Sequence, residues 1–207
     1  MTACMLFGRL FVTPILLDFI DRHPEVTART AFVDRVVNLM EEGVDIAVRI
    51  ADLPDSGLTA LLVGSVRQVL CASPDYLAAH GVPTKPNDLV EHRTIAFQGV
   101  TPAREWSFRG ESGESGEIIV RPSPRLIVNT AEMAIAAALR GRGITRVLSY
   151  MIAPELAAGR LKIVLAEYER PPVPIHLVHQ EGRRTSARVR AFLDFAANRL
   201  RADPSIN

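Results

Sequence analysis

Residues 38–77 place the tightest limits on the fold, because they predict a strand, a loop, a second strand and a helix in close succession. Residues 45–50 (DIAVRI) are a compact apolar run with one arginine, which is typical of a strand covered on both faces. Residues 53–57 (LPDSG) carry turn chemistry. Ser73 and Pro74 then predict a helix N-cap followed by proline at the first helical position. This order predicts an α/β fold, in which ligands bind at strand ends.

The same alternation of strands and helices continues along the chain. An apolar face at helical spacing predicts a first helix from Phe7 to Ile20, with Leu6, Leu10, Thr13 and Leu17 along it. Pro14 lies inside that pattern and predicts a kink or a late helix start. Further strands are expected at residues 25–32, 94–97, 106–109, 117–120, 126–128, 144–148, 161–165 and 175–179, and further helices at 34–42, 74–80, 87–89, 131–140, 151–157 and 186–201, with a proline-rich connector at 170–174.

The composition of the 207 residues is that of an ordinary globular protein, with 48% hydrophobic and 23% charged residues. A formal net charge of +1 makes this chain a poor candidate for direct contact with a phosphate backbone. We find no apolar run long enough to span a bilayer. The start of the chain also lacks the basic residues and the cleavage site of a signal peptide, so we expect a cytoplasmic location.

Cysteine and histidine spacing predicts no metal site. Cys4 and Cys71 are far apart and surrounded by apolar residues, so each is expected to be a buried free thiol. His176 and His179 are three residues apart on an expected strand and therefore face opposite sides. No phosphate-binding loop, nucleophile elbow or kinase signature is present, and no cofactor is expected.

Seven segments, in order, resemble the effector-binding domain of LysR-type transcriptional regulators. They are GVDIAVRIADLPDSGL, VRQVLCASPDYLAAHGVP, PNDLVEHRTIAF, VNTAEMAIAAALRGRGIT, APELAAGRLKIVL, VPIHLVH and RVRAFLDF. The resemblance implies a bilobed periplasmic-binding-protein-like fold of type 2, with two Rossmann-like lobes joined by two crossover strands. Lobe one would hold residues 1–70 and 176–207, and lobe two residues 71–175. The winged helix-turn-helix of the family is absent from this chain.

The resemblance also implies an effector site in a cleft between the lobes. In lobe one, Ala3, Cys4 and Met5 match the first strand-helix junction, although core packing is an equally good role for them. Arg49 and Ile50 lie where an expected strand meets its loop. A half-buried arginine needs a carboxylate partner, either on a ligand or in the protein. We favour an internal ion pair, for which the chain offers Asp45, Asp52 and Asp55.

In lobe two, the matching residues are Phe97, Gln98, Asn129, Thr130 and Thr145. Asn129 and Thr130 begin an alanine-rich helix, whose free N–H groups suit a carboxylate. Simple capping of that helix is the alternative, and an exposed loop residue is the alternative for Gln98.

Three functions fit these expectations. The resemblance favours a ligand-sensing domain whose small-molecule effector, such as a carboxylate, changes the arrangement of attached DNA-binding domains. It implies a homodimer that pairs the helix from Phe7 to Ile20 with the helix from Ala131 to Arg140 of the partner, and a tetramer in the full-length protein. Operator DNA would be bound only by the missing N-terminal domain. The alternatives are a stand-alone solute receptor, which the lack of an export signal disfavours, and an enzyme, for which no catalytic constellation is evident.

Overall fold

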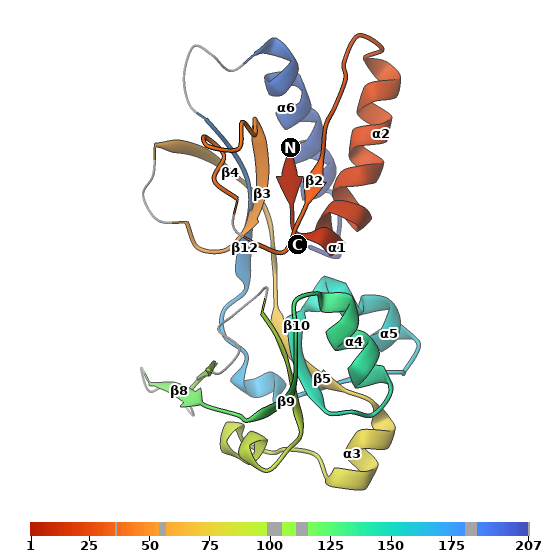
Figure 1. Cartoon of the computed structure of the whole chain (residues 1–207), viewed down its shortest axis with the longest axis vertical. Coiled ribbons are helices and arrows are strands. Elements are labelled where there is room, and N and C mark those ends of the chain that lie inside the picture. Colours follow the sequence, from red (N-terminus) through yellow and green to blue (C-terminus); the bar gives the residue numbers. More distant parts are fainter. Residues whose placement is uncertain (36, 54–56, 99–104, 111–115, 181–185, 207) are drawn as a thin grey trace. The chain divides into compact units, whose positions relative to one another are not determined.

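Strands and helices alternate along the chain, which confirms the predicted α/β class. The computed structural model describes residues 1–35, 37–53, 57–98, 105–110, 116–180 and 186–206. The chain forms two compact units: unit 1 comprises Met1–Val66 and Val173–Asn207, and unit 2 comprises Arg67–Pro172 (Figure 1). The chain therefore passes between the units twice. None of the helices in the described ranges has the length and hydropathy needed to cross a bilayer.

These divisions lie a few residues before the sequence-based boundaries at 70/71 and 175/176. Pairing explains the difference, because strand β5 (Gln68–Ala72) is hydrogen-bonded within unit 2 from its first residue. Strand β12 (Val173–Gln180) is likewise paired within unit 1 from Val173 onward. The prediction of an irregular connector at residues 170–174 is therefore wrong at its C-terminal end, where Pro174 lies in a strand opposite Ser65.

Unit 1 is built on a five-stranded sheet with the order β2-β1-β3-β12-β4. Strands β1, β2 and β3 run parallel, whereas β12 pairs antiparallel with β3 and β4. Strand β3 is buried along its first three residues, as expected for the strand predicted at 45–50. The remaining strands are β1 (Thr2–Ala3), β2 (Ala31–Phe32), β3 (Ile46–Ile50) and β4 (Leu58–Val66).

The first helical region contains a π-helical segment just before Pro14. Helix α1 (Met5–Phe7) leads into the π segment η1 (Gly8–Val12), and helix α2 (Thr13–Arg22) follows. Proline has no N–H to continue the α-helical pattern, and the N–H of Thr13 bonds to the carbonyl of Gly8 five residues back. The Thr13 hydroxyl reaches the same carbonyl at 2.9 Å.

This extra residue in the turn changes which side chains face the sheet. Leu10 and Leu17, which belong to the apolar face predicted from the sequence, are 44% and 53% exposed. The buried residues of the three segments are Leu6, Phe7, Gly8, Val12, Ile15 and Phe19. Gly8 lies against the ring of Phe32, since a Cβ at this position would be 2.4 Å from the ring.

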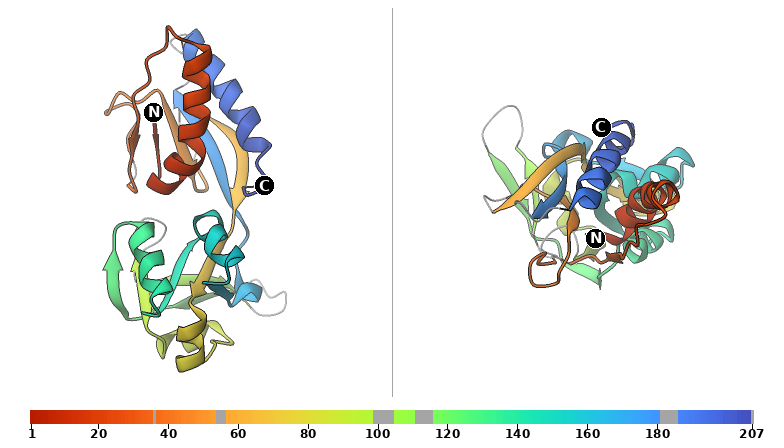
Figure 2. Two further views of the ribbon diagram at one scale, coloured as in Figure 1. Left: turned by 90° about the vertical axis from the view of Figure 1, so that its right-hand side faces the viewer. Right: turned by 90° about the horizontal axis from the view of Figure 1, so that it is seen from above.

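Helix α6 (Ala187–Arg201) lies beside α2 in unit 1 (Figure 2). The rings of Phe19 and Phe192 meet edge to face with centroids 5.2 Å apart. Arg199 and Asp18 form an ion pair at 2.9 Å beside them. The hydroxyl of Ser186 accepts the N–H of Val189 and caps α6, so the helix begins where the sequence predicts.

Residues 34–42 do not form the predicted helix. The chain makes a turn from Leu39 to Gly43, and the side-chain oxygen of Asn38 accepts the N–H groups of Met40 and Glu41. Such local bonds from asparagine compete with helical hydrogen bonds. The predicted amphipathic helix would turn both Val37 and Met40 inward; Val37 is buried, but Met40 is 73% exposed. The strand expected at 25–32 is formed only by its last two residues, and the turn at 53–57 lies largely outside the described residues.

Unit 2 is built on a five-stranded sheet with the order β11-β5-β10-β6-β9 and a separate hairpin of β7 and β8. All five residues of β10 are buried, so both faces of this strand are covered. The hairpin contributes Trp106 and Phe108 to a buried cluster with Leu70 and Ile144. The strands are β6 (Thr94–Phe97), β7 (Trp106–Arg109), β8 (Glu117–Val120), β9 (Pro124–Val128), β10 (Ile144–Leu148) and β11 (Lys162–Val164).

The helices of unit 2 follow the sequence-based prediction closely. They are α3 (Pro74–His80), η2 (Pro86–Val90), α4 (Ala131–Leu139), η3 (Ser149–Ile152), α5 (Ala153–Ala157) and η4 (Ala166–Tyr168). The helix predicted at 151–157 is thus divided into a 3₁₀ turn and a short α-helix. The apolar run at residues 126–128 predicts a buried strand, but Leu126 and Ile127 of β9 are exposed. Strand β9 is the last strand of its sheet and is paired only on its β6 side.

A contact between a tyrosine and a histidine predicts that the stability of unit 2 depends on pH. The hydroxyl of Tyr76 accepts the N–H of Arg93 at 2.9 Å and lies 3.1 Å from Nδ1 of His92. Burial lowers the pKa of His92 from its ordinary value, and nearby His80 lowers it further against the opposing effect of Asp88. The unfolded chain therefore takes up this proton first as the pH falls below about 6.5.

We expect the melting temperature of unit 2 to fall between pH 7 and pH 5, and to fall less in His92→Gln. Glutamine offers an oxygen that can accept from Tyr76 but does not titrate. The fluorescence of the lone Trp106 reports unfolding of this unit. An equal decline in the wild type and the variant would show that His92 does not cause it.

Candidate functional site

The junction between β1 and α1 positions the first three candidate residues of unit 1. Ala3 is buried at the end of β1, and its carbonyl accepts the N–H of Val33 at 2.9 Å. Cys4 is half-buried and precedes the helix, with no side-chain capping bond of its own. The N–H of Met5 instead bonds to a carboxylate oxygen of Asp34 at 2.9 Å. The helix start is therefore held by an aspartate that the sequence analysis assigned to a different helix.

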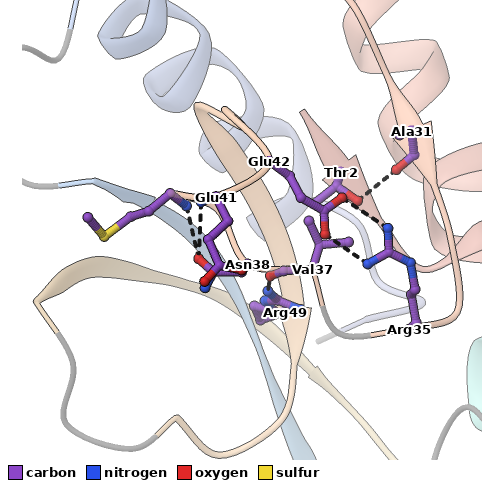
Figure 3. Close-up of polar contacts among 9 residues, drawn as sticks. Thr2, Ala31, Arg35, Val37, Asn38, Glu41, Glu42 and Arg49 are labelled. Carbon is purple, nitrogen blue, oxygen red and sulfur yellow. Dashed lines mark hydrogen bonds and ion pairs between the residues drawn. The ribbon is translucent and has the colours of Figure 1, made fainter.

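Arg49 lies near the end of β3, and its guanidinium donates to the carbonyl of Val37 (Figure 3). The favoured prediction of an internal ion pair is wrong for Asp45 and Asp52, neither of which pairs with Arg49 in the described part of the chain. Asp55, the third proposed partner, lies outside the described residues. The Val37 carbonyl accepts from this arginine but neutralises no charge.

The neighbouring ion pair in Figure 3 is of a different kind. Arg35 and Glu42 form two hydrogen bonds at 2.8 and 2.9 Å, and both side chains are largely exposed. The guanidinium of Arg35 lowers the pKa of the Glu42 carboxyl. Arg35 is thus paired with a carboxylate on the surface, whereas Arg49 is half-buried against a carbonyl.

Cys4 is electrostatically coupled to both charged residues of this junction. Burial raises the pKa of the Cys4 thiol, the negative charge of Asp34 raises it further, and the positive charge of Arg49 lowers it. The structure therefore brings together Cys4, Asp34 and Arg49, although they are far apart in the sequence. Ile50 follows Arg49 in β3 and is half-buried.

In unit 2, the candidate residues gather at the carboxyl ends of two parallel strands. Phe97 ends β6 opposite Val128, and the N–H of Gln98 bonds to the Val128 carbonyl at 3.0 Å. Asn129 follows directly and is exposed, as is Gln98. The hydroxyl of Thr130 accepts the N–H of Met133 at 3.4 Å, so this residue caps α4 as the sequence predicts. These four residues form one cluster at the sheet edge.

Thr145 stands apart from that cluster. It is the second residue of β10 and is fully buried, and its hydroxyl donates to the carbonyl of Ile95 at 3.1 Å. The bond joins β10 to the middle of β6. The hydroxyl is thus already used within the sheet.

The described residues hold no group of three or more histidine, cysteine or acidic side chains that could bind a metal ion. Cys71 is fully buried in β5, and burial raises its pKa to about 12. A thiol in this state is a poor nucleophile. The chemistry that the described site residues offer is therefore recognition by hydrogen bonds and charge.

Comparison of the sequence with known proteins identifies one family. The model of the LysR substrate binding domain matches residues 1–201. An HTH-type transcriptional repressor of Pseudomonas aeruginosa is 30% identical over 199 residues, which are 96% of this chain and 62% of the repressor. The chain thus spans less than two thirds of the length of this curated relative.

Solved structures agree with the sequence comparison. The regulatory domain of CrgA, a LysR-type transcriptional regulator from Neisseria meningitidis, is 28% identical and superposes with a TM-score of 0.81, covering 96% of each chain. The regulatory domain of AphB from Vibrio vulnificus is 25% identical with a TM-score of 0.81, covering 95% of this chain and 96% of that one. These likenesses confirm the periplasmic-binding-protein-like fold. The chain belongs to the LysR substrate-binding domain family, the effector-binding part of LysR-type transcriptional regulators.

Proposed function

We propose that this domain senses a small molecule that carries a carboxylate, and that Arg49 binds that carboxylate. The observation that carries the proposal is a half-buried guanidinium bonded to the Val37 carbonyl, with no carboxylate partner among the described residues. A positive charge in this position is stabilised by an anion that accepts two parallel N–H bonds. Ala3, Cys4, Met5 and Ile50 would surround the ligand with mainly apolar groups.

The strand-end cluster of unit 2 offers polar contacts of its own. The exposed amides of Gln98 and Asn129 can donate to and accept from polar groups of an effector. Phe97 adds an aromatic side chain, and the start of α4 at Thr130 favours negative charge. We propose these residues as effector contacts. Thr145 would instead stabilise the pairing of β6 with β10 through its hydrogen bond to the Ile95 carbonyl.

The dimer that the family resemblance implies has exposed apolar side chains available in both helices. Leu10 and Leu17 lie in the first helix and Met133 lies in α4, and all three are exposed. We propose that a homodimer buries them, and that a tetramer forms in the full-length regulator. Operator DNA would be bound by a separate domain of that longer protein in the cytoplasm, in keeping with the small net charge of this chain.

Ligand screening with matched pairs tests the proposal. Each pair is an aromatic or aliphatic carboxylic acid and its primary amide, measured by thermal shift on this chain. A ligand at 100 times its Kd stabilises the folded state by about 2.7 kcal/mol. We expect at least one acid to raise the melting temperature while its amide does not. Equal stabilisation by acid and amide would refute carboxylate recognition.

The relatives are named as transcriptional regulators, which favours sensing over the two alternatives of a solute receptor and an enzyme. The same screen addresses the enzyme. A stabilising compound that is recovered unchanged after incubation supports sensing, and one that is consumed supports catalysis.

A further inference from the structure

Unit 2 contains an arginine buried in the middle of its sheet. Arg146 lies in β10 opposite Leu70, and the residue is only 4% exposed. One nitrogen, Nη1, donates to the carbonyl of Ser107 at 3.2 Å, and the guanidinium lies 5.5 Å from the centre of the Trp106 ring. A carbonyl and an aromatic ring stabilise a cation but do not neutralise it.

A second nitrogen of the same guanidinium, Nε, is buried and makes no hydrogen bond to a described residue, and no described carboxylate is paired with this arginine. Nε and Nη2 form the edge with which arginine binds anions side-on. A buried charge left in this state is costly, so an anion at this edge would be stabilising.

A second arginine, Arg170, contacts the same hairpin residue, Ser107. Nη1 of Arg170 donates to the hydroxyl of Ser107 at 2.9 Å and lies 3.2 Å from a carboxylate oxygen of Glu117. Both side chains are about half-exposed. Burial and, as the smaller cause, the positive charge of Arg170 together lower the pKa of Arg146 to about 10. The described cluster therefore has two guanidinium groups and a single paired carboxylate.

We propose that Arg146, Arg170 and Ser107 bind a small inorganic anion of the size of chloride, in competition with Glu117. The near-complete burial of Arg146 leaves little surface for an organic ligand, which separates this site from the carboxylate site proposed at Arg49. The half-exposed Arg170 side chain can move to admit the ion and then close over it. The anion would tie the hairpin of β7 and β8 to β10 through residues of both.

Chloride is the probe for this site. The melting temperature of the 207-residue chain, followed by the fluorescence of Trp106, is compared in sodium chloride and in sodium gluconate at equal ionic strength. We expect a higher value in chloride, with a saturable dependence on its concentration. Arg146→Met should abolish the difference, and Arg170→Gln should raise the chloride concentration at half-saturation several-fold.

Glu117→Gln gives the opposite prediction and does not depend on the stability of an Arg146 variant. Removal of the competing carboxylate should lower the half-saturating chloride concentration several-fold. Arg121→Gln is the matched control, because Arg121 pairs with Glu105 beside the same hairpin and should leave the chloride effect unchanged. Equal melting temperatures in chloride and gluconate, or an unchanged chloride response in Glu117→Gln, would overturn the proposal. Since Arg49→Met should retain the response, the two proposed sites can fail separately.

Discussion

Gly143→Ala is expected to destabilise unit 2 by about 3 kcal/mol or more, from backbone strain and a steric clash together. Gly143 has a φ of +150°, where residues with a side chain are strained. A Cβ at this position would lie 2.3 Å from the carbonyl oxygen of Arg93. That oxygen accepts the N–H of Ile144 at 2.9 Å, beside the first pair between β10 and β6. Because the Cβ is held rigidly by its own backbone and the oxygen belongs to the backbone of Arg93, relief requires the two strands to separate.

Gly159→Ala is a control that introduces backbone strain without a steric clash. Gly159 also has a positive φ of +68°, but a Cβ there would meet nothing within 4 Å. The cost at this position should be the left-handed backbone alone, roughly 1–2 kcal/mol. Urea unfolding followed by the fluorescence of Trp106 measures both variants in the same unit. Equal losses of unfolding free energy would show that the contact with Arg93 contributes nothing.

Helix α3 shows how much of the fold local sequence can specify. Ser73 accepts the N–H of Tyr76, Pro74 occupies the first turn, and Gly81 ends the helix with a φ of +84°. All three signals act within a few residues of the helix ends, so its limits could be predicted without knowledge of the remainder of the chain. The strands at Thr94–Phe97 and Ile144–Leu148 were predictable for a similar reason, since each is a short apolar run between turn residues.

The π segment could not be predicted in this way. Pro14 allows a kink, a late start or a widened turn, and the sequence pattern around it does not choose among them. In the structure, the ring of Phe32 lies directly over Gly8, and this contact comes from a strand distant in sequence. Helical spacing alone therefore does not distinguish the exposed Leu10 and Leu17 from the buried Val12 and Ile15 of the same helical region.

Only part of the candidate site could be predicted from the sequence. The ends of the strands are predictable from the alternation of elements, and the family resemblance selects Phe97, Gln98 and Asn129 among them. The pairing of β6 with β9 brings these three residues together in unit 2. The partners of the two important arginines were not predictable. Arg49 bonds to a backbone carbonyl, which any residue can supply. Arg146 was missed because one arginine in an apolar strand could as well face solvent, and its contact with the β7–β8 hairpin is made through Ser107, which is distant in sequence.

Arg49→Met should weaken binding of the stabilising carboxylate about 10- to 100-fold, since hydrogen bonds to charged groups contribute roughly 1.5–3 kcal/mol. Methionine keeps much of the apolar stem but removes the charge and the donors. Arg49→Lys should recover only part of the affinity, because an ammonium cannot form the parallel pair of bonds. Titration calorimetry with the acid found by screening measures all three proteins. Arg35→Gln is the control, as this exposed arginine is already paired with Glu42.

The same variant has a consequence that needs no ligand. Arg49 lowers the pKa of the Cys4 thiol against the opposing effects of burial and Asp34. Its removal should raise that pKa and slow the reaction of Cys4 with iodoacetamide near pH 8.5, while the buried Cys71 stays unreactive in both proteins. A lower melting temperature with unchanged ligand affinity would show that Arg49 only holds the Val37 carbonyl. Reduced affinity at an unchanged melting temperature would establish the guanidinium as the group that binds the effector.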